Sequence, residues 1–287
     1  MDWREEYSDL GFIVVENVFS HALIDAHLVE ATALLREYGA FDAATMAALP
    51  IAADDALMVA MLNLHQRSEI ARRLLASPII RSILRQLFEA EPVLAFARSA
   101  LWQPEDMLAH VDTAFRSPDP PYSICRTWCA LEDIHPDSGR FYLVPGTHRS
   151  LAPRLCGEVL NERADLLALF EQLADAPESW RRLHNLAWPF VSAKVAERIE
   201  PDERIALDLK KGDVVFFNPA VAHGALACAD ASLTRKMMIC EWAAQRASGF
   251  ERGEPFASPF AHPRPISTQQ DNLIDIRPIL AARAASR

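Results

Sequence analysis

The feature that most constrains the fold is a series of short strand-like segments in the last two thirds of the chain. From about residue 93 the segments are either wholly apolar or alternate between apolar and polar residues, and turn sequences such as "PDSG" and "KKGD" separate them. About eight short strands separated by such turns predict a barrel-like pair of sheets, not parallel strands linked by helices. The segments lie at residues 93–103, 107–115, 123–134, 140–146, 205–218, 220–228 and 234–243.

Helical patterns precede and interrupt these strands. Ser20 precedes a segment whose apolar residues recur at three- and four-residue steps up to Gly39, and Ser77 with Pro78 begins a second such segment. Residues 151–202 are also helix-like, and an insertion there would lie at one mouth of the barrel. We expect one domain over residues 1–287, with helical support at 18–92, a β core at 93–150 and 203–245, an insertion or lid at 151–202, and a C-terminal tail at 246–287.

Charge and composition narrow the classes of partner. The chain has 39 acidic and 29 basic residues, a net charge of −10, so its field repels nucleic acid and anionic membrane surfaces. Its five cysteines form no CxxC pair, which favours reduced thiols. The N-terminus lacks a signal-peptide pattern, and no apolar run approaches the length of a membrane span. We expect a cytoplasmic protein that binds neither nucleic acid nor membranes.

His110 and Asp112 stand two residues apart in the apolar segment "MLAHVDTAF". In a strand, residues i and i+2 point to the same face, so both side chains could hold one ion. His223 is a lone imidazole in a second apolar segment; alone it would more often be a core histidine than a ligand. Two histidines and a carboxylate match the facial triad of non-haem Fe(II) oxygenases, while zinc is the commoner metal at histidine-rich sites. A similar triplet at 135–137 contains proline and is typical of an exposed turn.

Arg235 follows His223 by twelve residues, in the next expected strand. A guanidinium is costly to bury alone and fits a carboxylate in a bidentate fork. A dicarboxylate that chelates iron, such as 2-oxoglutarate, would bring the charges of Fe²⁺, Asp112, Arg235 and the cosubstrate to zero. The alternative is a surface arginine paired with an acid such as Asp230.

Longer stretches of the chain resemble the phytanoyl-CoA dioxygenase family of Fe(II)/2-oxoglutarate-dependent oxygenases. They are "YSDLGFIVVENVFS", "HVD", "TWCALEDIHPDSGRFYLVPGTHR" and "KKGDVVFFNPAVAHGALACADASLTRK", in the order that the family has. The resemblance implies a double-stranded β-helix (jelly roll, cupin-like) with flanking helices. It also implies that His110, Asp112 and His223 bind Fe(II) and that Arg235 binds the distal carboxylate of 2-oxoglutarate.

Two further residues are assigned to the cosubstrate by this resemblance. Trp128 lies where the family often has a tryptophan in the cosubstrate pocket, although a core aromatic is an equal alternative. Gln103 lies where a lysine or another polar group is common. The family's usual glutamine and serine are replaced by Val111 and Ala225, which would weaken cosubstrate binding by about 1 kcal/mol for each lost hydrogen bond.

These features predict a dioxygenase that hydroxylates a small-molecule metabolite with O₂ and releases succinate and CO₂. The presence of Asp112, where halogenating relatives have glycine or alanine, favours hydroxylation over chlorination. One alternative is desaturation, cyclisation or epimerisation by the same iron chemistry; another is an inactive ligand-binding barrel of the same fold. Arg126, Arg181 and Arg182 could recognise an anionic substrate, but ion-paired surface arginines are more common.

Overall fold

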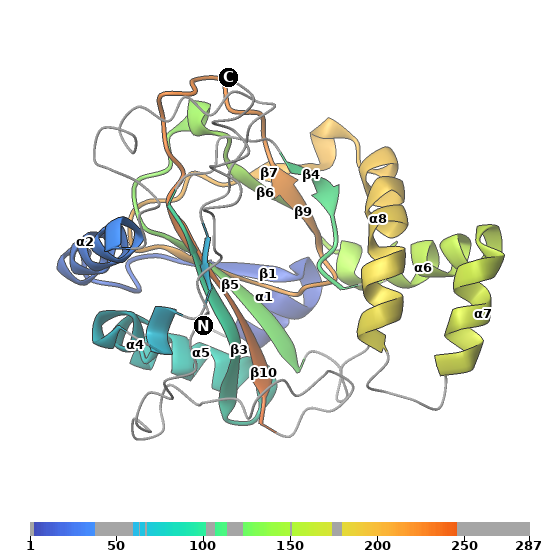
Figure 1. Ribbon diagram of the computed structural model, residues 1–287, viewed down its shortest axis with the longest axis horizontal. Helices are drawn as coiled ribbons and strands as arrows, with labels where there is room; N and C mark the ends of the chain where they lie inside the picture. The colour runs from blue at the N-terminus through green and yellow to red at the C-terminus, as the bar shows by residue number, and fades with distance from the viewer. Residues whose placement is uncertain are drawn as a thin grey trace.

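Two stacked antiparallel β-sheets form the centre of the molecule (Figure 1). The computed structural model describes residues 3–37, 60–62, 64–66, 68–101, 107–113, 123–149, 151–173 and 180–245. The larger sheet has the order β1 (Phe12–Val15), β8 (Val214–Phe217), β5 (Ile124–Ala130), β10 (Met237–Ala244), β3 (Pro92–Ala100) and β2 (Ala60–Leu62). The smaller sheet has the order β4 (Met107–His110), β9 (Ala222–Ala225), β6 (Phe141–Val144) and β7 (Ile205–Ala206). This arrangement confirms the predicted jelly-roll core.

Helices cover the outer faces of both sheets (Figure 1). The larger sheet is covered by α1 (Trp3–Leu10), α2 (His21–Glu37), α4 (Glu69–Leu75) and α5 (Pro78–Phe88). The smaller sheet is covered by α6 (Leu151–Glu162) and α8 (Trp180–Arg198), and α7 (Ala164–Leu173) packs against these two helices on the side away from the sheet (Figure 1). Short 3₁₀ helices are η2 (Leu64–Gln66), η3 (Pro136–Ser138), η4 (Thr147–Arg149) and η6 (Pro201–Glu203). None of the helices in the described ranges is long and apolar enough to cross a membrane.

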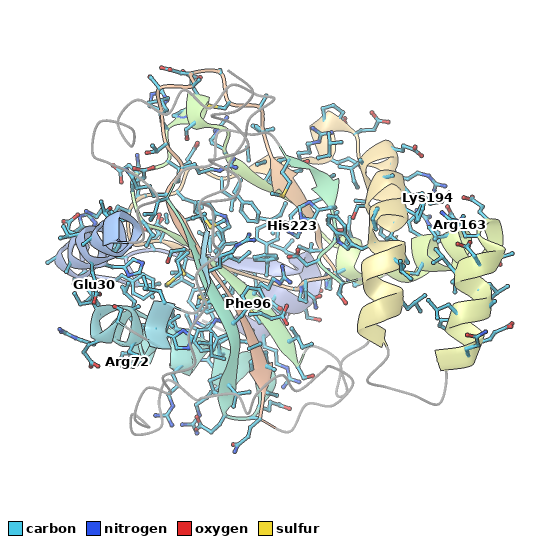
Figure 2. The ribbon with its side chains drawn as sticks, viewed as in Figure 1. Glu30, Arg72, Phe96, Arg163, Lys194 and His223 are labelled. Atoms are coloured by element: carbon cyan, nitrogen blue, oxygen red, sulfur yellow. The ribbon has the colours of Figure 1, made fainter. Side chains whose placement is uncertain are left out.

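The buried apolar residues divide into three clusters that follow these layers. One lies between the helices of the N-terminal half and the larger sheet, and a second lies between α6–α8 and the smaller sheet. The third fills the space between the two sheets and includes Trp128, Phe141 and Phe217. Figure 2 shows Phe96 on β3 and His223 on β9, which belong to the two sheets that enclose this third cluster.

Alternation along the strands decides which side chains enter the space between the sheets. On β5, Trp128 belongs to the inner cluster, whereas Cys125 and Cys129 belong to the cluster under the N-terminal helices. On β10, Ile239 faces inward and Cys240 outward. Because side chains two residues apart share a face, this alternation determines the walls of the site.

The two predicted serine caps have different outcomes. Ser20 accepts a hydrogen bond from the backbone N–H of Leu23 at 3.3 Å and confirms the prediction for α2. Ser77 occupies the N-cap position of α5, but its side chain makes no capping hydrogen bond. Pro78 at the first helical position fixes the backbone there, which accounts for the helix starting where predicted. The predicted tail at 246–287 and the predicted helix end at Gly39 lie outside the described residues.

Candidate active site

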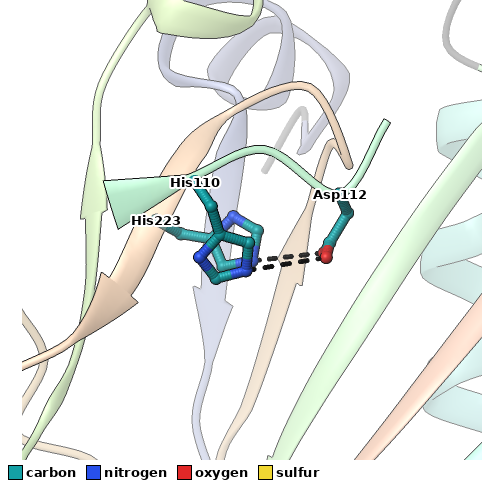
Figure 3. Close-up of side chains that lie close together, drawn as sticks. All are labelled: His110, Asp112 and His223. Carbon is teal, nitrogen blue, oxygen red and sulfur yellow. Dashed lines mark ion pairs between the residues drawn. The ribbon is translucent and has the colours of Figure 1, made fainter. Parts of the chain in front are cut away.

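The structure brings His110, Asp112 and His223 together in the space between the sheets (Figure 3). One ligand atom from each residue lies within 4.8 Å of the others. The Nε2 atoms of His110 and His223 lie 3.8 and 3.2 Å from the two oxygens of Asp112. The two histidines are also direct partners in the register of β4 and β9, and their ring centroids are 4.3 Å apart. Strand pairing therefore positions the two imidazoles.

Asp112 reaches this point by a different route from the one predicted. β4 ends at His110, so strand alternation does not align the two residues. The backbone N–H groups of Asp112 and Thr113 instead donate to the carbonyl of Pro219 at 2.8 and 3.2 Å. These bonds fix the turn after β4 against the loop before β9, and the turn directs the carboxylate toward the imidazoles.

Both histidines are held in the tautomer that leaves Nε2 available. The Nδ1 of His110 bonds the carbonyl of Leu108 at 2.9 Å, and the Nδ1 of His223 bonds that of Val221 at 2.9 Å. A carbonyl only accepts, so Nδ1 carries the proton and the unprotonated Nε2 faces the centre. This second hydrogen bond is the usual device that orients a metal-binding histidine.

Burial and neighbouring charges set the protonation states of the site. Burial lowers the pKa of His110 to about 4, and His223 adds to this effect, so the imidazole is neutral at pH 7. Burial alone would raise the pKa of Asp112, but the guanidinium of Arg126 holds it well below its usual range. Two imidazoles whose Nε2 atoms face the centre, together with one ionised carboxylate, are the donor set that a divalent metal requires, so the residues present fit Fe(II).

Arg126 on β5 is the main residue that sequence reasoning placed wrongly. Its side chain is 15% exposed, not a surface arginine, and its Nη1 lies 2.6 Å from Oδ2 of Asp112. Its Nε and Nη2 lie 3.0 and 2.9 Å from Oε2 of Glu241 on β10. The signal in the sequence was strand alternation, because residues two apart in a strand point to the same face. Arg126 precedes Trp128 by two residues, and the two share the inner face of β5.

The predicted cosubstrate residues have different outcomes. Trp128 is buried and stacks on Phe141 with centroids 5.4 Å apart, and Phe141 meets the edge of His223 at 5.7 Å. Arg235 is buried two residues before β10, where it donates to the carbonyl of Gly139. Burial lowers its pKa to about 10, so it stays cationic at neutral pH. Gln103 lies outside the described residues.

The two departures from the family pattern fall on opposite faces. Val111 is buried in the cluster between the smaller sheet and α6–α8, away from the inner space. Ala225 follows His223 by two residues on β9, on the same face of the strand. Only the alanine therefore removes a possible hydrogen bond from the inner wall. Trp188 of α8 covers the site at this edge: its Nε1 donates to the carbonyl of Val111 at 2.8 Å, and its ring lies edge-on to His110 at 5.9 Å.

A family model described as phytanoyl-CoA dioxygenase (PhyH) matches residues 7–237, which is most of the chain. The chain belongs to the phytanoyl-CoA dioxygenase family. This family consists of non-haem oxygenases that depend on Fe(II) and 2-oxoglutarate, as the resemblance in the sequence implied. No curated protein sequence matches the chain significantly.

Solved structures with the same fold include those of three proteins. The 2-oxoglutarate-dependent carbocyclase SnoK from nogalamycin biosynthesis is 19% identical, with a TM-score of 0.56, over 84% of this chain and 82% of its own. The epimerase SnoN, solved with Fe³⁺, 2-oxoglutarate and nogalamycin RO, is 16% identical, with a TM-score of 0.56, over 93% and 95%. HygX from Streptomyces hygroscopicus, solved with nickel and 2-oxoglutarate, is 16% identical, with a TM-score of 0.54, over 84% and 85%. At these identities the similarity establishes the fold.

Proposed function

We propose that this family member is an Fe(II)- and 2-oxoglutarate-dependent dioxygenase that hydroxylates a small-molecule metabolite. The observation that supports this most strongly is the meeting of two Nε2 atoms and one ionised carboxylate, all within 4.8 Å. His110, Asp112 and His223 would hold Fe(II) on one face and leave the other positions open. Iron together with 2-oxoglutarate supplies the activation of O₂ and the release of succinate and CO₂.

The other residues of the site orient groups and exclude water. Arg235 would pair with the distal carboxylate of 2-oxoglutarate, because it is a buried cation two residues before the start of β10. Trp128 would form the apolar wall of the cosubstrate pocket. Arg126 holds the carboxylate of Asp112 ionised and oriented, and Trp188 covers the ligand turn against solvent. Because His110 and His223 are buried, bulk water would be kept from competing with substrate and O₂ for the open positions of the metal.

The proposal is tested with purified protein in two steps. Anaerobic addition of Fe(II) and 2-oxoglutarate should produce a visible charge-transfer band, and admission of air should release succinate. Asp112→Ala should lose both. Asp137→Ala is the matched control, because Asp137 belongs to the exposed turn of the second histidine–aspartate triplet, and it should retain both. A wild-type protein with neither band nor succinate would favour the inactive ligand-binding barrel.

The mass of the product distinguishes hydroxylation from the alternative reactions. Hydroxylation adds one oxygen atom to the substrate, desaturation or oxidative ring closure removes two hydrogens, and epimerisation leaves the mass unchanged. The related structures named as a carbocyclase and an epimerase make these outcomes the second candidate for this fold. A succinate-release screen across candidate metabolites, followed by mass spectrometry, distinguishes them.

We also infer a cytoplasmic location. The five cysteines are all free thiols and four of them are buried, which suits a reducing compartment. The expected partners are a small-molecule substrate and O₂.

A further inference from the structure

Arg98 on β3 is a second arginine on the inner wall of the site. Ala100 belongs to the cluster between the sheets and Phe96 packs against that cluster, whereas Ala97 belongs to the outer cluster and Ser99 bonds His27 of α2. Arg98 therefore shares the inner face with Phe96 and Ala100. In the register of the larger sheet it pairs with Ile239, which pairs in turn with Trp128.

The guanidinium of Arg98 has no anionic partner in the part of the chain that the structure describes. Its Nε is enclosed and lacks a hydrogen-bond partner there. Burial is the main cause that lowers its pKa; Arg126 lowers it further and Asp112 raises it, as expected for a cation beside both groups. The two carboxylates nearby are already engaged, because Asp112 and Glu241 both contact Arg126. Burial of an arginine in this position costs free energy unless a ligand supplies the missing negative charge and hydrogen-bond acceptors.

The charges of the assembled site indicate what that ligand is. Among the charged groups of the described residues at the site, Arg98 and Arg126 balance Asp112 and Glu241, and Fe(II) would balance the dianion of 2-oxoglutarate. Arg235 then leaves one positive charge in excess. A substrate with a single negative charge makes the buried assembly neutral, whereas a neutral substrate leaves a cation without a partner.

We propose that Arg98 binds a carboxylate of the substrate, so that the enzyme acts on monocarboxylic acids. This inference rests on the proposed oxygenase function. A guanidinium offers a planar pair of donors that matches a carboxylate. The cosubstrate carboxylate is assigned to Arg235, which lies four residues from Ile239 along the chain and outside β10. Arg98 is therefore available to bind the carboxylate of the substrate.

The test uses protein loaded with Ni(II) and 2-oxoglutarate, so that Arg235 and the metal are occupied and no turnover occurs. The probes are acetate, benzoate and phenylacetate, each compared with its primary amide, at constant ionic strength. Thermal unfolding is followed across a concentration series of each probe. The acids should raise the melting temperature and the amides should not. Arg98→Gln should weaken the binding of the acids by tenfold or more, and Arg98→Lys should weaken it less.

The controls separate this site from the cosubstrate site and from a general loss of charge. Arg85→Gln, on the surface of α5, should bind the acids like the wild type. Equal effects of acids and amides, or equal binding of acids by the wild type and Arg98→Gln, would overturn the assignment. Loss of 2-oxoglutarate binding in Arg98→Gln would assign Arg98 to the cosubstrate instead. Failure of the oxygenase function shows separately, as a wild type without the Fe(II)·2-oxoglutarate band.

Discussion

Replacement of Arg126 by methionine should destabilise the metal-free protein severely. Arg126 contacts Asp112 and Glu241, whose side chains are 12% and 6% exposed. Methionine conserves much of the apolar stem but leaves both carboxylates without their cation. Removal of one partner from a buried ion pair costs about 3–5 kcal/mol. Since two carboxylates lose their partner at once, we expect the upper part of this range, which corresponds to a fall in melting temperature of roughly 8–20 °C.

Two additions to this experiment identify the cause of the loss. In Arg126→Met/Glu241→Leu one stranded charge is removed together with its partner, so the double variant should recover about 2 kcal/mol relative to Arg126→Met. Ni(II) should stabilise Arg126→Met more than it stabilises the wild type, because the metal supplies the cation that Asp112 has lost. The measurement is urea unfolding with and without Ni(II).

The pH dependence gives an independent check. In the wild type the folded-state pKa of Asp112 lies below its ordinary value of 3.8. The stabilisation that the ionised carboxylate gains from Arg126 is therefore complete above pH 3.8, and it is lost as the pH falls toward the folded-state pKa. The difference between the wild type and Arg126→Met should therefore shrink toward pH 3. A loss below 1 kcal/mol at pH 7, or additive effects of the Arg126 and Glu241 substitutions, would show that this buried network is not coupled in the way described.

Three other substitutions give separate predictions. Arg235→Gln should weaken 2-oxoglutarate binding roughly tenfold to a hundredfold, as expected for a charged hydrogen bond, with Ni(II) binding unchanged; titration of the charge-transfer band measures it. Trp188→Phe removes the hydrogen bond to Val111 and should cost about 1–2 kcal/mol in urea unfolding; an unchanged midpoint would argue against the bond. Burial lowers the pKa of His27 to about 4 from 6.5, so the unfolded state binds more protons between these values and the free energy of unfolding falls by about 3 kcal/mol as the pH drops from 6.5 to 4. His27→Gln should flatten that decline, and an unchanged pH profile would contradict the assignment.

The sequence predicted the fold and the two imidazoles because each depends on a local pattern. Alternating and apolar segments gave the strands of the smaller sheet and β3, β5, β8 and β10 of the larger one, whereas β2 lies in the range expected to be helical. His110 and His223 each lay in such a segment. Their pairing across β4 and β9 follows once the strands are antiparallel neighbours. The position of Asp112 could not be derived in the same way. It depends on the carbonyl of Pro219, which lies more than a hundred residues away and carries no recognisable signal in the sequence.

The buried charges were harder to predict because their partners are distant in the chain. Arg126 and Glu241 are separated by 115 residues, and an arginine in a strand is more often at the surface. Composition and spacing could not reveal that two strands pair at this register. The structure settles it, because Glu241 is opposite Arg126 on one side and opposite Phe96 on the other.

Alternation along the strands nevertheless carried information about these charges. Arg126 lies on the same face of its strand as Trp128, and Glu241 lies on the same face as Ile239. Arg98 lies on the same face as Phe96 and Ala100. A charge at an inner position must have a buried partner or a ligand, since isolation there is costly. Two of the three charges have a partner on a neighbouring strand, and Arg98 has none in the described chain. The histidines and the aspartate thus form the proposed site for the metal that the family uses, whereas Arg98, an inner charge without its own counterion among the described residues, is the residue that we propose binds the substrate.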